Sequence, residues 1–354
     1  MTPLATERLP RIARPAEGVA VLRRRVSVRI LWLVALAAVL VLLSVASVAI
    51  GSRVVGLDEI VAGVSGSTEG IGEAAVLKRV WRTGLALLVG AALGLAGGVM
   101  QGVTRNPLAD PGILGVNMGA SLAVVVGMAW FGLWTFTGFI WTAIGGAAAA
   151  AVFVYVVGSL GRGGATPLKL ALAGAATSAA ALSFINAVVL PRGDIADQAR
   201  SWQIGGVGGA APSAIAQVLP FLVVGIVVCL ASARSLNSLA LGDELAAGLG
   251  ERVAVARAFA ALGAVLLCGA ATAVAGPIGF VGLVIPHLCR LLVGADYRWL
   301  LPFSALGGAA LVTLSDIVGR IIARPEEIDV GIITAVIGAP FFIYIVRRQR
   351  VREL

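Results

Sequence analysis

Charged residues are scarce in this sequence. Only 13% of its 354 residues are charged, whereas 59% are hydrophobic and the mean hydropathy is +0.99. A soluble domain of this length cannot hide such a composition from water, which excludes an ordinary soluble protein. The net charge of +9 would suggest a nucleic-acid partner in a soluble protein. In a membrane protein the basic residues must first be placed relative to the bilayer. We therefore expect lipid as a partner and no nucleic acid.

Residues that bind metals, form disulfides or hold nucleotides are equally scarce. Cys229, Cys268 and Cys289 lie far apart without a C-x-x-C spacing, which supports neither a disulfide framework nor a zinc site. The single histidine, His287, follows Pro286 and has no Cys or carboxylate at ligand spacing. We expect it to bond a freed backbone carbonyl and assign no metal or cofactor to the chain. The phosphate-loop pattern G-x-x-x-x-G-K-[ST] is absent, so the chain does not bind ATP by that device.

Ten apolar segments predict an all-α polytopic membrane protein with ten transmembrane helices. They lie near residues 30–51, 83–103, 112–131, 138–158, 168–190, 212–232, 257–275, 278–294, 300–321 and 329–346. The first segment follows an arginine-rich tail and could pass for a signal peptide. It is long enough to cross about 30 Å of hydrocarbon, so we expect a retained span. The predicted divisions are a disordered cytoplasmic tail at 1–29, a ten-helix transmembrane domain at 30–346 and a short basic cytoplasmic C-terminus at 347–354.

The distribution of basic residues predicts the orientation of these helices. On a ten-span path, 19 of the 27 Lys and Arg residues fall on one side and eight on the other. The side richer in basic residues faces the cytoplasm. We therefore expect both termini in the cytoplasm.

Glycine is abundant, with 46 residues, and is concentrated within the spans. Small residues let helices approach closely in lipid, so segments 88–102 and 262–276 should form the crowded centre of the bundle. Each is followed by a Pro/Gly break, at 106–115 and at 276–287. This recurrence favours an inverted repeat of helices 2–5 and 7–10. Convergent Gly/Ala composition explains it about as well.

Four motifs, in this order and spacing, resemble the iron-chelate and cobalamin permease family (FecCD type) of ATP-binding-cassette importers. They are LKRVWRT…GAALGLAGGVMQGVTRNPLADPGILGVNMGA at 77–120, SWQIGG at 201–206, GPIGFVGLVIPHLCR at 276–290, and D-x-x-x-R at 316–320 leading to EEIDVGIITAVIGAPFF at 326–342. The resemblance implies a permease subunit of the inner membrane that moves an iron–siderophore, haem or cobalamin type of substrate inward by alternating access. It also implies a second permease subunit, identical or closely related, an extracytoplasmic solute-binding protein, and two cytoplasmic ATPase subunits that bind ATP and magnesium.

Two rival functions remain at this point. An ion-coupled secondary transporter would also have inverted repeats and broken helices, but it predicts several intramembrane carboxylates, and Asp316 stands almost alone. A non-transport scaffold or sensor predicts an appended soluble domain, and the sequence contains no polar segment of that size.

The connection 235–257 resembles the segment with which the family couples to its ATPase. Two glycines bracket a short helix that carries acidic and leucine side chains, and such a helix suits a groove on a partner. The coupling residues implied are Leu241, Gly242, Asp243, Glu244, Leu245, Leu249 and Gly250. A solvated loop helix is the alternative.

Arg79 and Arg82 resemble the paired arginines on the family's outer surface, and Arg320 resembles a third. In that family they meet acidic residues of the binding protein, and arginine suits this because its guanidinium pairs with carboxylates at any relevant pH. Glu327 is placed in the same predicted docking site. The alternative is that these arginines reach lipid phosphates, as basic residues at span ends usually do. Trp81 and Asp329 stand where the family usually has proline, which puts the local docking geometry in doubt.

Polar residues within the spans receive more modest assignments. Asp316 and Arg320 are one helical turn apart, and we favour a structural ion pair over a proton relay. A gate or path role is expected for Gln101, Asn106, Pro107 and Asn117. Hydrogen bonding between helices, or plain turn punctuation, would also account for these four.

Overall fold

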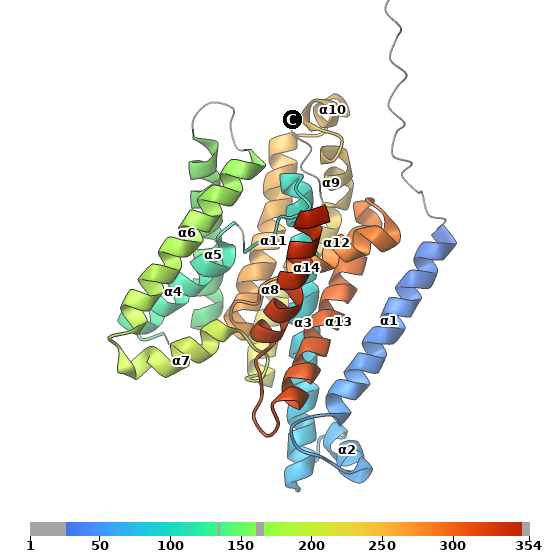
Figure 1. Cartoon of the computed structure of the whole chain (residues 1–354), viewed down its shortest axis with the longest axis vertical. Coiled ribbons are helices and arrows are strands. Elements are labelled where there is room, and N and C mark those ends of the chain that lie inside the picture. Colours follow the sequence, from blue (N-terminus) through green and yellow to red (C-terminus); the bar gives the residue numbers. More distant parts are fainter. Residues whose placement is uncertain (1–25, 113, 134, 161–165, 349–354) are drawn as a thin grey trace, which may run out of the picture.

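The computed structural model describes residues 26–112, 114–133, 135–160 and 166–348. Within these ranges the regular structure is entirely α-helical (Figure 1), which confirms the all-α prediction. The helices are α1 Val26–Ala49, α2 Leu57–Val64, α3 Ile71–Thr104, α4 Val116–Phe131, α5 Phe136–Ser159, α6 Pro167–Val189, α7 Gly193–Ile204, α8 Pro212–Ala231, α9 Ala233–Leu239, α10 Asp243–Gly248, α11 Val253–Ala275, α12 Val281–Val293, α13 Tyr297–Ile322 and α14 Val330–Arg348. Residues 1–25 and 349–354, which make up most of the two predicted basic tails, lie outside the described residues.

Seven of the described helices are long and apolar enough to cross a membrane. They are α1, α3, α5, α6, α8, α11 and α13, and each overlaps a predicted segment, although α3 begins at Ile71 and not near residue 83. The segments predicted near 112–131, 278–294 and 329–346 contain the shorter apolar helices α4, α12 and α14. A polytopic helical bundle is therefore confirmed, while the count of ten spans stays a prediction.

Short helices mark the two ends of the bundle. The α10 end carries α9 and α10 and also the first turn of α1, whereas the α2 end carries α2, α7 and the connection 323–329 (Figure 1). The last described helix, α14, runs from the α2 end toward the α10 end. It therefore finishes on the side where the first described helix, α1, starts.

The centre of the bundle is built on glycine contacts between α3 and its neighbours. A Cβ atom at Gly90 or Gly94 of α3 would overlap the backbone of α13, and one at Gly97 would overlap the backbone of Gly282 in α12. Such contacts bring helix backbones together where lipid supplies little force for association. The predicted crowding of segment 88–102 is confirmed, since α3 is largely buried between Leu85 and Gly102.

The packing partners of α3 and α11 bear on the predicted inverted repeat. The two helices run in opposite directions, and each is followed by a break and a short helix (Figure 1). The α3 helix packs most closely on α13, while α11 packs on α5 and α8. In a repeat that relates α3 to α11 and α5 to α13, the α3–α13 and α11–α5 contacts are equivalent. This pattern favours the repeat, which remains a prediction.

Candidate functional site

Charged side chains from α3, α13 and the connection 323–329 meet at the α2 end. We call Arg79, Arg82, Asp316, Arg320 and Glu327 the arginine cluster. All three arginines are buried, with 6% of Arg79, 7% of Arg82 and 1% of Arg320 exposed. The structure therefore brings the predicted docking residues together, but it turns the arginines into the protein.

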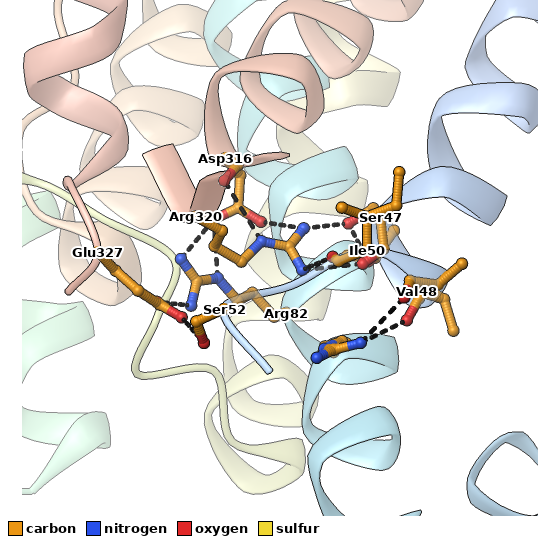
Figure 2. Close-up of polar contacts among 11 residues, drawn as sticks. Ser47, Val48, Ile50, Ser52, Arg82, Asp316, Arg320 and Glu327 are labelled. Atoms are coloured by element: carbon orange, nitrogen blue, oxygen red, sulfur yellow. Dashed lines mark hydrogen bonds and ion pairs between the residues drawn. The ribbon is translucent and has the colours of Figure 1, made fainter. Parts of the chain in front are cut away.

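Arg82 is held by two carboxylates (Figure 2). Its Nε and Nη2 each lie 2.7 Å from Asp316 Oδ1, and its Nη1 lies 2.5 Å from Glu327 Oε2. The predicted pair within α13 is also present, with Arg320 Nη2 2.8 Å from Asp316 Oδ2. Asp316 is completely buried and shares its single negative charge between two arginines from different helices. The i,i+4 spacing revealed one of these partners, whereas the contact with Arg82 spans 234 residues of sequence.

The other guanidinium contacts of the cluster reach the end of α1. Arg320 Nη1 donates to the carbonyl oxygens of Ser47 and Ile50 at 2.8 and 3.0 Å (Figure 2). Arg79 donates to Ala49 O at 3.1 Å and Arg53 O at 2.5 Å. The last carbonyls of a helix have no partner within it, and cations are favoured there. Most of α1 is exposed and the rest packs on α13 and α3, so these arginines fix the C-terminal end of a helix at the edge of the bundle.

Arg324, which the motif comparison did not single out, takes part in the same anchoring. Its Nη2 donates to Gly51 O at 2.6 Å, just beyond the end of α1. The sequence signal available for it was only its position one turn beyond Arg320, on the connection between two predicted spans.

Glu327 is the most accessible member of the cluster, with 35% of its side chain exposed. Its Oε1 accepts a hydrogen bond from Ser52 Oγ at 2.9 Å. Partial burial opposes ionisation of this carboxyl, but the hydrogen bond and charge of Arg82 outweigh it and lower the pKa of Glu327. Glu327 is thus an ionised side chain lying between Arg82 and the exterior.

The two departures from the family pattern lie close to the cluster. Trp81 is 38% exposed on α3. Asp329 precedes α14, and burial raises the pKa of its carboxyl. The carboxylate of Asp329 occupies the space that a Cβ at Gly206 would need, so the glycine of the SWQIGG motif accommodates it. The neighbouring Gly205 accepts a hydrogen bond from Gly331 N at 2.8 Å, which joins this motif to the start of α14.

At the α10 end, the predicted coupling segment forms α9 and α10. Gly242 and Gly250 have positive φ angles of 106° and 86° and bracket α10, as predicted. Around α10, Ala246 is fully buried, whereas Leu241, Leu245 and Leu249 are 57%, 63% and 68% exposed. We call these three side chains the leucine face. Glu244 is also exposed.

Asp243, at the start of α10, is held by two arginines. Its Oδ1 lies 2.8 Å from Arg105 Nη2 and 2.7 Å from Arg257 Nη2. Arg105 caps α3 in the left-handed region with a φ of 50°, so the contact ties α10 to the end of the central helix. Nearby, Asn237 of α9 donates to Asp296 Oδ1 at 2.8 Å and accepts from Tyr297 N at 2.9 Å. The segment is therefore fixed on the bundle while its leucines remain exposed.

The residues predicted for a gate or path lie at the junction of α3, α4 and α12. Gln101 is 2% exposed and its Nε2 donates to Gly282 O at 3.2 Å. Asn106 Oδ1 accepts from Leu108 N at 3.0 Å in the turn that contains Pro107. Asn117 is 5% exposed and lies in the first turn of α4.

Sequence reasoning missed Asp110 as a member of this junction. Its carboxylate accepts hydrogen bonds from Gly112 N at 2.7 Å and from the backbone N–H of Leu283. An acidic residue is favoured at a helix N-terminus, and Leu283 lies in the first turn of α12. In the sequence, Asp110 is visible only as part of the NPLADPG turn at 106–112, and nothing there indicates its bond to α12.

An open groove of about 710 Å³ follows one side of α14. Its wall is apolar and rich in small side chains. The lining includes Ile204 of α7 and Ile332, Ala335, Val336, Ala339 and Pro340 of α14. None of the four predicted gate or path residues lines it.

Comparisons with known proteins agree with the motifs. Residues 38–348 match the FecCD transport family. The ferric enterobactin transport system permease protein FepD of Escherichia coli K12 is 42% identical over 328 residues, covering 91% of this chain and 98% of that protein. The iron(3+)-hydroxamate import system permease protein FhuB of Bacillus subtilis is 43% identical over 272 residues, covering 77% of this chain and 71% of that protein.

A solved structure described as an inward-facing metal-chelate type ABC transporter has the same fold. It is 28% identical, with a TM-score of 0.77, and the likeness covers 90% of this chain and 99% of that one.

Proposed function

The chain belongs to the FecCD transport family, and from this membership we propose that it moves an iron–siderophore, haem or cobalamin type of substrate into the cytoplasm by alternating access. It is a multi-pass membrane permease component of an ABC importer and not an enzyme. The relatives named above are permeases for ferric enterobactin and for iron(3+)-hydroxamate, which supports a chelated metal as the cargo.

The leucine face carries the proposal. Three large apolar side chains are exposed on and directly beside a six-residue helix that lies at one end of the bundle rather than along it. We assign the α10 end to the cytoplasm, where two ATPase subunits with bound ATP and magnesium would receive this helix in a groove. Apolar anchors supply affinity in such a contact, and the rim charges of Asp243 and Glu244 would set its register.

The α2 end would then face outward and receive the solute-binding protein. The arginine cluster and the neighbouring Arg324 support this assignment, because together they place four arginines against the two carboxylates of Asp316 and Glu327. The excess of positive charge suits a partner with acidic side chains.

The groove on α14 supports contact with a second permease subunit. Small residues such as Ala335 and Ala339 in a concave apolar surface favour close helix packing over contact with lipid tails. We propose that this second subunit, a copy of the chain or a close relative, packs there and that the substrate path lies between the two.

Ion-coupled transport is the alternative, and the state of Asp316 argues against it. A proton or sodium relay needs carboxylates that can exchange their ion, whereas Asp316 is buried between two arginines. The carboxylate therefore serves structure rather than ion exchange.

Uptake assays test the function. In a strain lacking its own permeases, this chain is expressed with its ATPase and binding protein, and uptake of labelled ferric siderophores, haem and cobalamin is measured. We expect uptake of one of these classes that stops when ATP is depleted and persists when ionophores collapse the ion gradients. Uptake of none of them would contradict the substrate class, and loss with the ionophore alone would favour the secondary transporter.

A further inference from the structure

The two carboxylates that hold Arg82 differ in how freely they can leave it. Asp316 is completely buried, receives both Nε and Nη2 of Arg82, and also neutralises Arg320. Glu327 contacts only Nη1 and has 35% of its side chain exposed. Removing Asp316 would take a counter-charge from two buried arginines, whereas the partly exposed Glu327 can turn toward water.

From this difference we propose that Glu327 is an exchangeable partner of Arg82, occupying the place that an acidic side chain of the solute-binding protein takes on docking. The proposal rests on the function proposed above, because it needs a binding protein at the α2 end. It assigns Glu327 a role opposite to that of a docking contact: the side chain competes with the partner.

The exchange can remain local because the backbone that follows Glu327 is held independently of its side chain. Ile328 N donates to Gly319 O at 3.0 Å, and Gly331 N donates to Gly205 O at 2.8 Å. The one other side chain hydrogen-bonded to Glu327 is Ser52, among the residues that the structure describes. Only the glutamate side chain therefore has to turn outward.

Electrostatics also favour a like-for-like exchange. A guanidinium that lacks a counter-charge within the protein is costly, so Nη1 of Arg82 should keep a carboxylate partner until the binding protein arrives. A resident carboxylate keeps the charge paired in the free permease, and an incoming carboxylate keeps it paired in the complex. The surrounding arginines, Arg79, Arg320 and Arg324, stay bonded to the end of α1 throughout. Docking thus needs no rearrangement of the α1 anchor.

The test is the affinity of the binding protein for the permease, assembled with its ATPase subunits in lipid nanodiscs. Glu327→Gln keeps the size of the side chain but removes the competing charge. We expect it to bind the partner about fivefold more tightly, the equilibrium equivalent of one partly exposed ion pair. Glu326→Gln, at the exposed neighbouring position, removes the same charge from the same connection and should change affinity much less.

Unchanged or weaker binding by Glu327→Gln would overturn the exchange, since Glu327 would then be neutral or itself a contact of the partner. Equal tightening by Glu326→Gln would also overturn it, because the effect would reflect net charge alone. Glu327→Asp, which retains the carboxylate, should restore affinity toward the wild-type value. If the wild-type complex does not bind the partner at all, the proposed function fails and the exchange has no partner to act on.

Discussion

The arginine cluster and the leucine face invite comparison, because the same kind of task, docking a partner, was expected of both. At the α2 end the conspicuous charges are buried and bonded to one another and to α1. At the α10 end the paired charges of Arg105 and Asp243 are only partly exposed, whereas the side chains of the leucine face are largely exposed. A charged motif in a helical membrane protein can therefore serve folding first, whereas exposed leucines at a helix end are the clearer sign of a partner.

Asp316 and Asp243 make the sharpest test of this contrast, since each is held by two arginines. Asp316→Asn leaves two buried guanidinium groups short of a counter-charge and should destabilise the protein by about 3–5 kcal/mol. Asp243→Asn, at a position 44% exposed, should cost no more than about 1 kcal/mol. Thermal unfolding of the purified variants in one detergent would measure both. Equal losses of stability would remove the distinction between the two ends.

The anchor of α1 gives the next largest effect. Arg79→Ala removes the donors to Ala49 O and Arg53 O, and loss of hydrogen bonds to a charged group costs about 1.5–3 kcal/mol. We expect faster proteolysis at residues 50–56, which follow α1, measured on protein in nanodiscs. The matched control is Lys78→Ala, which removes a neighbouring exposed cation and should leave proteolysis unchanged. Equal protection in both variants would show that α1 is held by other contacts.

How much of this could be predicted from the sequence depends on the length scale of each feature. Seven of the ten predicted spans, the glycine-rich centre and the α10 helix between Gly242 and Gly250 follow from local composition and backbone preference, and they were predicted correctly. The Asp316–Arg320 pair follows from helical periodicity alone.

Contacts between distant segments could not be predicted in this way. Arg82 meets Asp316 and Glu327, and Arg320 meets Ser47, only because α1, α3 and α13 pack together. Resemblance to a family marked these arginines as important, but it carried no information on their burial. Asp110 was missed for the same reason, since its partner Leu283 is on another helix.

The leucine face should respond in binding rather than in stability. Leu245→Asp places a charge on a side chain that is 63% exposed, so unfolding should be unaffected. If the leucine enters an apolar groove of the ATPase, burying an unpaired carboxylate there should weaken binding at least about tenfold. Pull-down of the ATPase subunit from detergent extracts measures this. Asp197→Lys, a charge change on a fully exposed side chain of α7 at the opposite end, is the control. Wild-type recovery of the ATPase with Leu245→Asp would contradict the assignment of the α10 end.

The smallest expected effect concerns the acid stability contributed by Glu327. Its pKa is lowered in the folded protein, the hydrogen bond and charge of Arg82 prevailing over partial burial. A carboxyl with a lowered pKa stabilises the fold above its unfolded pKa, about 4.3 for glutamate, and this contribution is lost as the pH falls through the folded value. Wild type should therefore exceed Glu327→Gln in melting temperature at neutral pH, and the gap should narrow once the pH drops below about 4.3. Asp243→Asn removes a carboxylate at the opposite end of the bundle. Any difference between its melting temperature and that of wild type therefore reports on Arg105 and Arg257. A gap for Glu327→Gln that widens toward acid would mean that the glutamate is not held as a carboxylate by Arg82, and the arginine cluster would then rest on Asp316 alone.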